Sequence, residues 1–370
     1  MQNDSNSNSI DVNEKIIKVL MSKIAFVTDT MHPGGSERVI SVLANEMARR
    51  GMNIQIICLR GRDSFYSLAY NVKTIFMEQE IEKITMLNKV KFLRSFVKEK
   101  GIDIVIPFMT PVFCFTLFAL LGTGRTIICS ERIDPTKTSK VRKLLRAVLL
   151  PTTSYLVVQT EQIKKYYSGR IQKKCSVIYN PVSDSFFEGN KVVSKKRFIS
   201  VGRLAPQKNQ RMLIDAFFHV HQRYPDYSLS IYGEGPLKEE LQSFIDSKGL
   251  NDAVRLEGTS SDISKEMHSS FAFCLTSDFE GMSNAMIEAL CAGIPLISTN
   301  VSGSAELLGN NEGGLIVPVH NTEAFASAML KLVESPALAE RMRNYNLKKR
   351  EEFRTSQIVD KWIEIINRFS

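Results

Sequence analysis

The amino-acid sequence predicts an α/β protein made of two doubly wound domains, each with a parallel sheet. Short apolar runs rich in β-branched residues alternate with helical patterns along the 370 residues. Runs this apolar are typical of strands that helices cover on both faces. There are more of them than one open sheet usually holds, and a polar stretch interrupts them after Val182.

The expected strands fall into two groups on either side of that polar stretch. The first group covers residues 23–29, 53–59, 102–108, 126–131 and 154–160. The second covers residues 197–202, 227–233, 253–258, 271–277, 294–299 and 313–319. Each group is long enough for its own Rossmann-like, doubly wound domain.

These groups define the expected domain organisation. We expect a disordered extension over 1–20, an N-terminal domain over 21–182, a linker over 183–196, a C-terminal domain over 197–352 and a terminal helix over 353–370. The polar start of the chain suggests Met21 as the true first residue. The terminal helix carries the only tryptophan, Trp362, on an apolar face. This pattern fits a helix that docks across both domains and equally one that caps the second.

Composition excludes several classes of protein. The chain is 44% hydrophobic and 24% charged, which is globular composition. Its six cysteines lie mostly inside apolar runs without Cys-x-x-Cys spacing, so we expect buried, reduced thiols in a cytoplasmic protein. No apolar run approaches the ~18 residues needed to cross a bilayer. The 48 Lys and Arg against 39 Asp and Glu suggest acidic partners.

A glycine pair follows the first expected strand. Gly34 and Gly35 stand just before a helix whose apolar face includes Val39, Leu43 and Met47. Such a turn lets the backbone approach a ligand, and the helix N-terminus favours an anion. A tight turn that needs glycine for steric reasons is an equal alternative.

Two cations follow the first strand of the second group. Arg203 and Lys208 flank a proline-containing loop that begins at Gly202. At the carboxyl edge of a parallel sheet, a guanidinium and an ammonium together suit a diphosphate. The alternative is a pair of solvated surface cations.

Two glutamates flank a predicted helix start near Ser283. Glu280 lies in the preceding loop, and Glu288 lies more than one turn inside an otherwise apolar helix that Ser283 or Asn284 can cap. The two carboxylates could span a sugar diphosphate, with its anion at the helix N-terminus between them. Alternatively, Glu288 is a solvated helix residue and Glu280 only stabilises the helix dipole.

Taken together, FEGMSNAMIEALCAGIPLIST, VGRLAPQKN and PGGSERV resemble the GT-B fold nucleotide-sugar glycosyltransferases, specifically retaining glycosyltransferase family 4 of bacterial surface-polysaccharide type. The resemblance extends from about Lys23 to Val319 with the motifs in family order. It implies two Rossmann-like domains that face each other across a cleft.

The resemblance also implies roles for individual residues. Arg203 and Lys208 would bind the donor diphosphate, Glu280 the transferred sugar and Glu288 the ribose. Further donor contacts would come from the following residues: Gly34, Gly35, Gly258, Thr259, Gly281, Met282, Ser283 and Asn284. A clamped diphosphate is stabilised as a leaving group. Because the chain has no Asp-x-Asp pair, we expect no cofactor and no obligatory metal.

One position departs from the family pattern. Many members carry a histidine where this chain has Phe108 and Met109. This leaves the catalytic group on the acceptor side unnamed. Glu131 and Arg132 are candidates for acceptor contacts, and a charged turn with an internal salt bridge is the alternative.

Much of the basic charge lies between Lys137 and Lys174, where ten Lys or Arg residues stand against the single acid Glu161. One predicted helix there has an apolar face formed by Val141, Leu144, Leu145 and Val148, beside the cations Lys140, Arg142, Lys143 and Arg146. Such a helix can lie on an anionic membrane or meet a lipid-linked diphosphate. A core-packed helix with a solvated basic face is the alternative. Residues 112–121 could form a second shallow membrane contact, although a buried helix is favoured.

The basic charge could also suggest a nucleic-acid partner. We do not expect the protein to bind nucleic acid, because no recognition motif is present.

The leading hypothesis is a retaining glycosyltransferase. It would move a hexose or N-acetylhexosamine from a nucleoside diphosphate sugar, expected to be UDP-linked, to a polyprenyl-diphosphate-linked glycan at the cytoplasmic face of the membrane. The alternatives are a sugar-nucleotide epimerase of similar fold and a non-catalytic, membrane-associated binder of sugar nucleotides.

Overall fold

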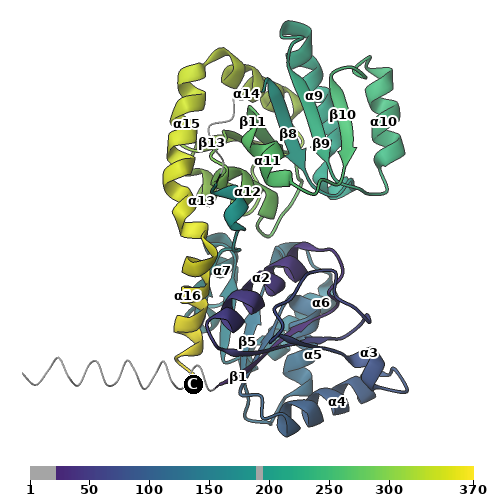
Figure 1. Ribbon diagram of the computed structural model, residues 1–370, viewed down its shortest axis with the longest axis vertical. Helices are drawn as coiled ribbons and strands as arrows, with labels where there is room; N and C mark the ends of the chain where they lie inside the picture. Colours follow the sequence, from purple (N-terminus) through teal and green to yellow (C-terminus); the bar gives the residue numbers. More distant parts are fainter. Residues whose placement is uncertain (1–21, 189–194) are drawn as a thin grey trace, which may run out of the picture. The chain divides into compact units, whose positions relative to one another are not determined.

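A computed structural model describes residues 22–188 and 195–370. Its contacts divide the chain into two compact units (Figure 1). Unit 1 comprises the residues up to Pro181 together with Thr355–Ser370, and unit 2 comprises Val182–Arg354. The expected N-terminal extension and part of the expected linker lie outside the described residues.

Unit 1 contains a seven-stranded parallel sheet in the order β3-β2-β1-β4-β5-β6-β7. The order reverses between β1 and β4, which makes the sheet doubly wound. The strands are β1 Lys23–Thr28, β2 Asn53–Cys58, β3 Lys73–Phe76, β4 Ile104–Pro107, β5 Thr126–Ser130, β6 Tyr155–Val158 and β7 Cys175–Val177.

Helices cover both faces of this sheet, because alternate residues of each strand point to opposite sides. Ile24 and Phe26 of β1 pack in one core with α2 and α16, whereas Ala25 and Val27 pack in another with α4 and α5. The helices are α2 Gly35–Arg49, α3 Met77–Glu80, α4 Met86–Glu99, α5 Thr110–Ala119, α6 Lys140–Leu149, α7 Glu161–Tyr166, α8 Gly169–Gln172 and α16 Thr355–Ile366, with 3-10 turns at Pro135–Lys137 and Leu150–Thr152.

The terminal helix α16 packs within unit 1, beside α2 (Figure 1). Trp362 is fully buried, and its ring stacks on Phe108 at a centroid distance of 6.1 Å. Asp360 forms an ion pair with Arg50, next to the C-terminus of α2. The apolar face of this helix therefore completes the core of the first sheet, whereas the sequence pattern had left open docking across both domains and capping of the second domain.

Unit 2 repeats the same winding with six parallel strands in the order β10-β9-β8-β11-β12-β13. The reversal point lies between β8 and β11. The strands are β8 Arg197–Val201, β9 Ser228–Tyr232, β10 Val254–Gly258, β11 Ala272–Leu275, β12 Leu296–Thr299 and β13 Gly314–Val317.

Helices also surround the second sheet. On one face, Phe198 of β8 and Leu229 of β9 pack with Leu213 and Phe217 of α9. The helices are α9 Gln210–Arg223, α10 Lys238–Ser247, α11 Ile263–His268, α12 Asn284–Cys291, α13 Ser304–Leu308, α14 Thr322–Glu334 and α15 Pro336–Lys349, with 3-10 turns at Asp184–Phe186, Pro206–Lys208 and Arg350–Phe353.

The predicted fold class is confirmed, and each of the expected strands is found. The sequence analysis missed β3 and β7. Both are edge strands of the first sheet, and both are short. An edge strand lacks one neighbour, so it does not need the continuous apolar run of a central strand.

Candidate functional site

Two loops of unit 2 emerge side by side at the reversal point of its sheet. One follows β8 and carries Arg203 and Lys208, and the other follows β11 and carries Glu280. Because β8 and β11 are hydrogen-bonded neighbours, both loops leave the same edge of the sheet. Ligands of doubly wound folds bind at such a switch point, outside the carboxyl ends of the strands.

Hydrogen bonds connect the two loops directly. The backbone amide of Asp278 donates to the carbonyl of Gln207 at 2.9 Å, and the Gln207 side chain donates to the carbonyl of Phe279 at 2.8 Å. The hydroxyl of Thr276 donates to the carbonyl of Lys208 at 2.9 Å. The backbone of each loop therefore holds the other, which limits the freedom of the side chains they carry.

Lys208 and Glu280 form an ion pair, with Nζ 2.5 Å from Oε1. The Ser277 hydroxyl donates to the same carboxylate oxygen at 2.7 Å. The side chains are 20% and 10% exposed, so the pair is largely covered but reachable from solvent. Lys208 is not the solvated cation of the alternative interpretation, since a carboxylate holds its ammonium in place.

Arg203 has different surroundings. Its side chain is exposed, and none of the described residues engages its guanidinium in a hydrogen bond or ion pair. The Gln210 side chain donates to the Arg203 carbonyl at 2.9 Å, which fixes the backbone and leaves the guanidinium available. A planar guanidinium without a protein partner can still bind a phosphate through two parallel hydrogen bonds.

A glycine-rich loop after β9 supports the Arg203 loop. Gly233 has a φ of 140°, and a Cβ there would lie 2.1 Å from the carbonyl oxygen of Gly202. A Cβ on Gly235 would lie 2.2 Å from the carbonyl oxygen of Leu204. The amide of Leu204 donates to the carbonyl of Glu234 at 3.0 Å. Both glycines are required by this close backbone approach.

Gly258 continues this arrangement at the end of β10. Its carbonyl accepts from the amide of Gly233 at 2.7 Å, and its φ is 69°. A Cβ at Gly258 would lie 2.9 Å from a carboxylate oxygen of Glu234. The following residue, Thr259, is exposed. The loops after β8, β9 and β10 thus form one connected rim.

Helix α12 begins at this rim. The Ser283 hydroxyl accepts from the amide of Met286 at 3.4 Å, so Ser283 is the N-cap rather than Asn284. The preceding Gly281 is half-buried and the Met282 side chain is buried. Glu288 is only 4% exposed, which excludes the interpretation as a solvated helix residue. The unit therefore combines two cations with a capped helix N-terminus, the chemistry that binds a diphosphate.

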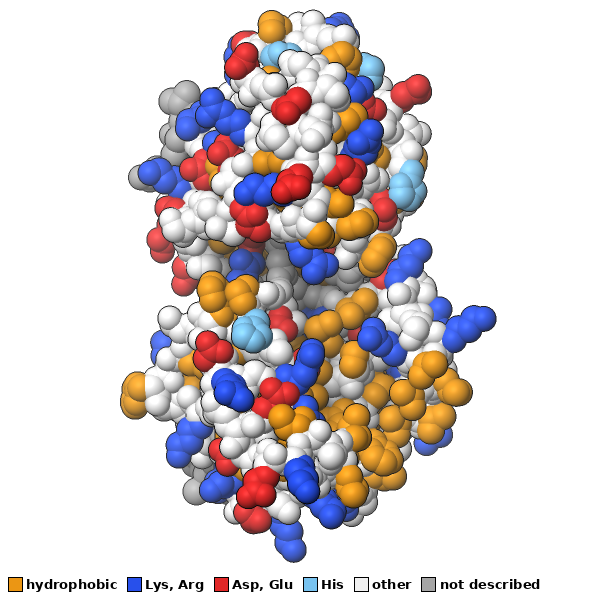
Figure 2. All heavy atoms as spheres, turned by 90° about the vertical axis from the view of Figure 1, so that its right-hand side faces the viewer, with side chains coloured by type: hydrophobic (Ala, Val, Ile, Leu, Met, Phe, Trp, Pro, Cys, Tyr) orange, Lys and Arg blue, Asp and Glu red, His pale blue; other side chains and the backbone are white. Residues whose placement is uncertain are grey.

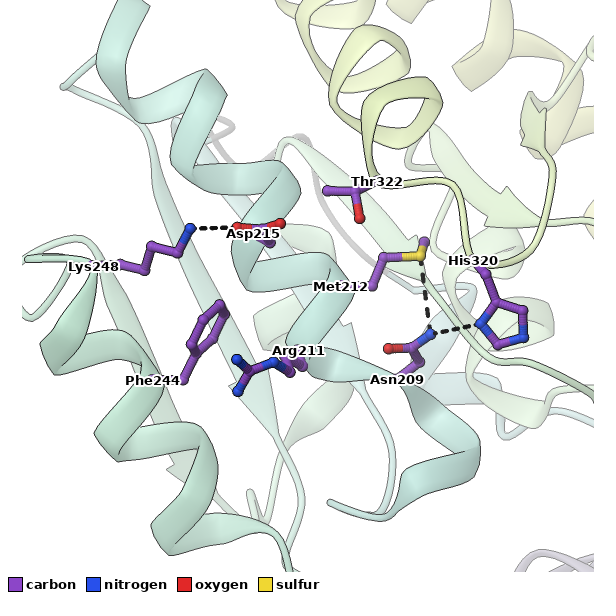
Figure 3. Close-up of a pocket in the computed structure, with 8 residues that line it drawn as sticks. All are labelled: Asn209, Arg211, Met212, Asp215, Phe244, Lys248, His320 and Thr322. Carbon is purple, nitrogen blue, oxygen red and sulfur yellow. Dashed lines mark hydrogen bonds and ion pairs between the residues drawn. The ribbon is translucent and has the colours of Figure 1, made fainter.

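A pocket of about 410 Å³ borders the Lys208 loop on the side of α9 (Figure 3). There the Asn209 amide donates to the Asp278 carboxylate at 3.0 Å, and His320 Nδ1 lies 3.3 Å from that carboxylate. The sequence-predicted site residues are not among those that line this pocket. It lies against the predicted site without containing it.

In unit 1, Gly34 is the N-cap of α2. The Tyr66 hydroxyl bridges its amide and its carbonyl, at 3.0 and 2.8 Å. A Cβ on Gly34 would lie 2.2 Å from a carboxylate oxygen of Glu37. Because Glu37 can swing away and the Gly34 backbone is extended at φ −168°, a steric need for glycine is not established, and a ligand contact of Gly34 or Gly35 stays a prediction.

Met109 stands beside this turn. The Ser36 hydroxyl lies 3.3 Å from the Met109 sulfur, and the Met109 backbone has a left-handed φ of 72°. Such strain at a residue other than glycine is uncommon and gathers at functional sites. By contrast, Phe108 is fully buried against Trp362. No sequence pattern indicated the Met109 conformation.

Two residues expected to contact an acceptor are buried. Glu131 is 0% exposed and accepts hydrogen bonds from Thr110, at 2.8 and 2.9 Å, and from Tyr167 at 3.2 Å. The guanidinium of Arg146, 3% exposed, lies 3.6 Å from it. Burial raises the pKa of Glu131, while these hydrogen bonds and Arg146 lower it. This enclosure corrects the expectation for Glu131, which does not reach the surface. Arg146 lines a pocket of about 280 Å³, so its contact with an acceptor stays a prediction.

Arg132 is also held by the protein. It donates to Ser130 at 2.7 Å and to Asn180 at 2.6 Å, and its guanidinium lies over the Phe108 ring at 4.6 Å. The alternative interpretation, a salt bridge within this charged turn, is not found, because Glu131 pairs with Arg146 of α6 outside the turn.

The basic helix α6 turns its apolar face outward. Val141, Leu144, Leu145 and Val148 are all exposed, which rules out a core-packed apolar face. Lys140 and Arg142 are exposed and Lys143 is half-buried, whereas Arg146 points inward. Helix α5 is mostly buried, as favoured, although Phe118 near its end is exposed.

Within residues 22–188 and 195–370, no helix has the length and apolar character needed to span a bilayer. Within the same ranges, no group of three or more His, Cys, Asp and Glu side chains is placed to hold a metal ion.

Comparison with known families matches this architecture. The family described as "Glycosyl transferases group 1" matches residues 182–349, and "Glycosyltransferase Family 4" matches residues 33–186. The chain is a family 4 glycosyltransferase. The two matches meet at the boundary between the units and together span most of the chain.

Curated relatives of the glycosyltransferase cover nearly its full length. One from Campylobacter jejuni, a GalNAc-α-(1→4)-GalNAc-α-(1→3)-diNAcBac-PP-undecaprenol α-1,4-N-acetyl-D-galactosaminyltransferase, is 28% identical over 94% of this chain and 98% of its own. A second from the same organism, an N-acetylgalactosamine-N,N'-diacetylbacillosaminyl-diphospho-undecaprenol 4-α-N-acetylgalactosaminyltransferase, is 27% identical over 88% and 93%.

Among solved structures, Anabaena HepE in complex with UDP superposes with a TM-score of 0.78. The alignment covers 94% of the glycosyltransferase and 100% of HepE, at 17% identity. This likeness confirms the GT-B fold.

Sequence reasoning missed several residues that shape the site of the glycosyltransferase. Ser277 donates to Glu280, although the sequence marked it only as the last residue of an expected strand. Gly233 and Gly235 were overlooked, although the pattern YGEGP at the end of an expected strand was a usable signal. No local pattern indicated that His320 approaches Asp278, because these residues lie on separate loops.

Proposed function

We propose that this glycosyltransferase retains anomeric configuration and transfers a hexose or N-acetylhexosamine from a UDP-linked donor to a lipid-linked glycan in bacterial polysaccharide synthesis. The main support for donor binding is that Arg203, Lys208 and the α12 N-terminus all follow strands at the switch point of unit 2. Support for the acceptor class comes from the Campylobacter relatives, whose names specify undecaprenol-linked sugars. Support for UDP comes from the UDP complex of the structural neighbour.

The chemistry follows from the charges. The bond between the anomeric carbon and the donor phosphate breaks, a bond to an acceptor hydroxyl forms, and the hydroxyl proton passes to the leaving phosphate. Negative charge grows on the diphosphate, where Arg203, Lys208 and the α12 amides stabilise it. Glu280 keeps the Lys208 ammonium in position through the 2.5 Å contact. Glu288 would hold the ribose, by its resemblance to the family motif.

The test is transfer from radiolabelled donors to a synthetic undecaprenyl-diphosphate-linked sugar, using a panel of UDP- and GDP-sugars. We expect one UDP-sugar to give a product whose new linkage has the donor's anomeric configuration by NMR. Interconversion of the sugar nucleotide without acceptor would indicate the epimerase instead. A product of inverted configuration would overturn the assignment of retention.

We also propose that the enzyme works at the cytoplasmic face of the membrane. The support is the outward apolar face of α6 together with Lys140, Arg142 and Lys143. An amphipathic helix with cations beside its apolar face binds anionic bilayers.

Co-sedimentation with phosphatidylglycerol vesicles tests this location. Replacing Lys140, Arg142 and Lys143 by Gln is expected to lower the bound fraction severalfold, while Arg146 is left in place because it is buried. The matched control replaces three exposed cations of unit 2, Lys196, Arg223 and Lys238, by Gln. Equal losses in both variants would show a general charge effect and contradict a role for α6.

A further inference from the structure

Unit 1 contains an apolar pocket of about 370 Å³ between the exposed face of α6, helix α5 and the start of α4. Its lining residues include Cys114, Phe115, Phe118, Arg142, Leu145 and Leu149. Carbon and sulfur surfaces therefore dominate the interior, and a cation stands at the edge.

The polar groups of the pocket offer little to a polar ligand. The hydroxyl of Thr110, which also lines it, donates to the buried Glu131 carboxylate. Burial raises the pKa of the Cys114 thiol to about 11, so the sulfur stays neutral. A hydrogen-bonding ligand would lose its contacts with water here, whereas an alkyl or alkenyl chain would not.

The mouth of the pocket opens onto an exposed apolar surface. Phe118, Leu145 and Met86 line the pocket and are also exposed, and Val141, Leu144 and Val148 continue the surface along α6. Figure 2 shows hydrophobic side chains gathered on unit 1, with Lys and Arg side chains at their margin. A continuous apolar surface of this kind marks an interaction site.

Charge at the mouth points to the head group of the ligand. Arg142 lines the pocket, its side chain is exposed, and its guanidinium has no ion-pair or hydrogen-bond partner among the described residues. Lys140 lies on the same helix and is also exposed. These cations at the mouth favour a ligand whose apolar chain lies inside the pocket and whose anionic head group lies outside it.

The volume indicates how much of a chain the pocket encloses. At ~30 Å³ for each water-sized group, the pocket holds about twelve such groups. That matches about two isoprene units. We propose that this pocket binds the first isoprene units of a prenyl diphosphate, with Arg142 facing the diphosphate. This inference rests on the proposed lipid-linked acceptor and names the part of it that unit 1 binds.

The test compares two glutamate substitutions on one face of α6. Leu145→Glu places a charge in the pocket lining, whereas Val148→Glu places the same charge on the same exposed face outside it. Both positions are exposed, so we expect both variants to fold, which thermal melting checks. Binding of farnesyl diphosphate is measured calorimetrically with saturating UDP present, so that the donor site is occupied.

We expect Leu145→Glu to weaken binding of farnesyl diphosphate at least tenfold and Val148→Glu to change it less than threefold. Inorganic pyrophosphate should bind both variants and the unsubstituted enzyme alike. If the two substitutions change the affinity for farnesyl diphosphate equally, or not at all, the proposed binding in this pocket is wrong. Tighter binding of oleoyl lysophosphatidic acid than of farnesyl diphosphate, lost in Leu145→Glu, would overturn the prenyl assignment.

This measurement is independent of transfer activity. If farnesyl diphosphate binds as expected while no sugar reaches a prenyl-linked acceptor, the proposed reaction fails and the pocket stands. If transfer occurs while Leu145→Glu leaves the affinity for farnesyl diphosphate unchanged, the proposed reaction stands and the proposed prenyl-binding pocket is wrong.

Discussion

Each unit contains an acid just beyond a strand that pairs with a base from another segment, yet the two pairs differ in access. In unit 1, Glu131 after β5 faces Arg146 at 3.6 Å, and the side chains are 0% and 3% exposed. In unit 2, Glu280 beyond β11 holds Lys208 at 2.5 Å, and the side chains are 10% and 20% exposed.

The surroundings of the two pairs explain what each can do. Thr110 and Tyr167 donate hydrogen bonds to Glu131, whose carboxylate is fully buried, so we call this the closed pair. The pair in unit 2 keeps one face open at a rim that also carries the exposed Arg203. A buried pair organises the fold, whereas a partly open pair can exchange part of its interaction for a ligand.

Breaking the closed pair is expected to have the largest effect. Arg146→Ala leaves a carboxylate buried without its cation, which costs about 3–5 kcal/mol of unfolding free energy. Chemical denaturation measures the loss. The control is Lys143→Ala, which removes a cation from the same helix at a half-buried position.

A double variant sharpens this prediction. Glu131→Leu combined with Arg146→Met removes both charges, so we expect much of the stability lost in Arg146→Ala to return. A loss below about 1 kcal/mol in Arg146→Ala would show that the pair is not structural.

Breaking the open pair should affect turnover more than stability. Lys208→Ala removes a donor from the developing diphosphate charge and is expected to lower the transfer rate about 10²–10³-fold, or about 2.7–4 kcal/mol. The rate is measured with labelled donor. Lys196→Ala, which removes an exposed cation paired with Asp226 in the same unit, serves as the control.

A stability loss in Lys208→Ala as large as that in Arg146→Ala would erase the contrast between the two pairs. Near-normal turnover of Lys208→Ala would remove this lysine from the site.

The smallest effect concerns the helix start beside the open pair. Ser283→Ala removes the cap of α12 and is expected to cost about 1 kcal/mol of unfolding free energy. It should also weaken UDP binding a few-fold, because the first-turn amides lose their alignment toward the anion.

Ser335→Ala is the matched control, since Ser335 caps α15 through the amide of Leu338 in the same unit. It should lose similar stability and bind UDP normally. If both variants bind UDP equally, the α12 N-terminus takes no part in donor binding.

Much of the proposed donor site was predictable because its residues follow strands within a few positions. Arg203, Lys208 and Glu280 stand in loops after apolar runs, and the carboxyl ends of neighbouring parallel strands meet at one edge. The ion pair between Lys208 and Glu280 was not predictable, since 72 residues separate them and only the pairing of β8 with β11 brings them together.

Helix α6 and the Glu131 segment show the opposite result. Periodicity correctly predicted a helix with an apolar face, but not that this face points away from the core. Similarly, the sequence predicted that Glu131 contacts an acceptor, whereas in the structure Thr110, Tyr167 and Arg146 surround its carboxylate.

The order of residues along this chain was enough to specify all strands except β3 and β7, the winding of each sheet and the loops proposed to bind the donor. These features depend on neighbours within a few positions. Only the tertiary structure decided which residues are buried. The covered side of α6 and the enclosed charges depend on contacts with segments that are distant in the sequence.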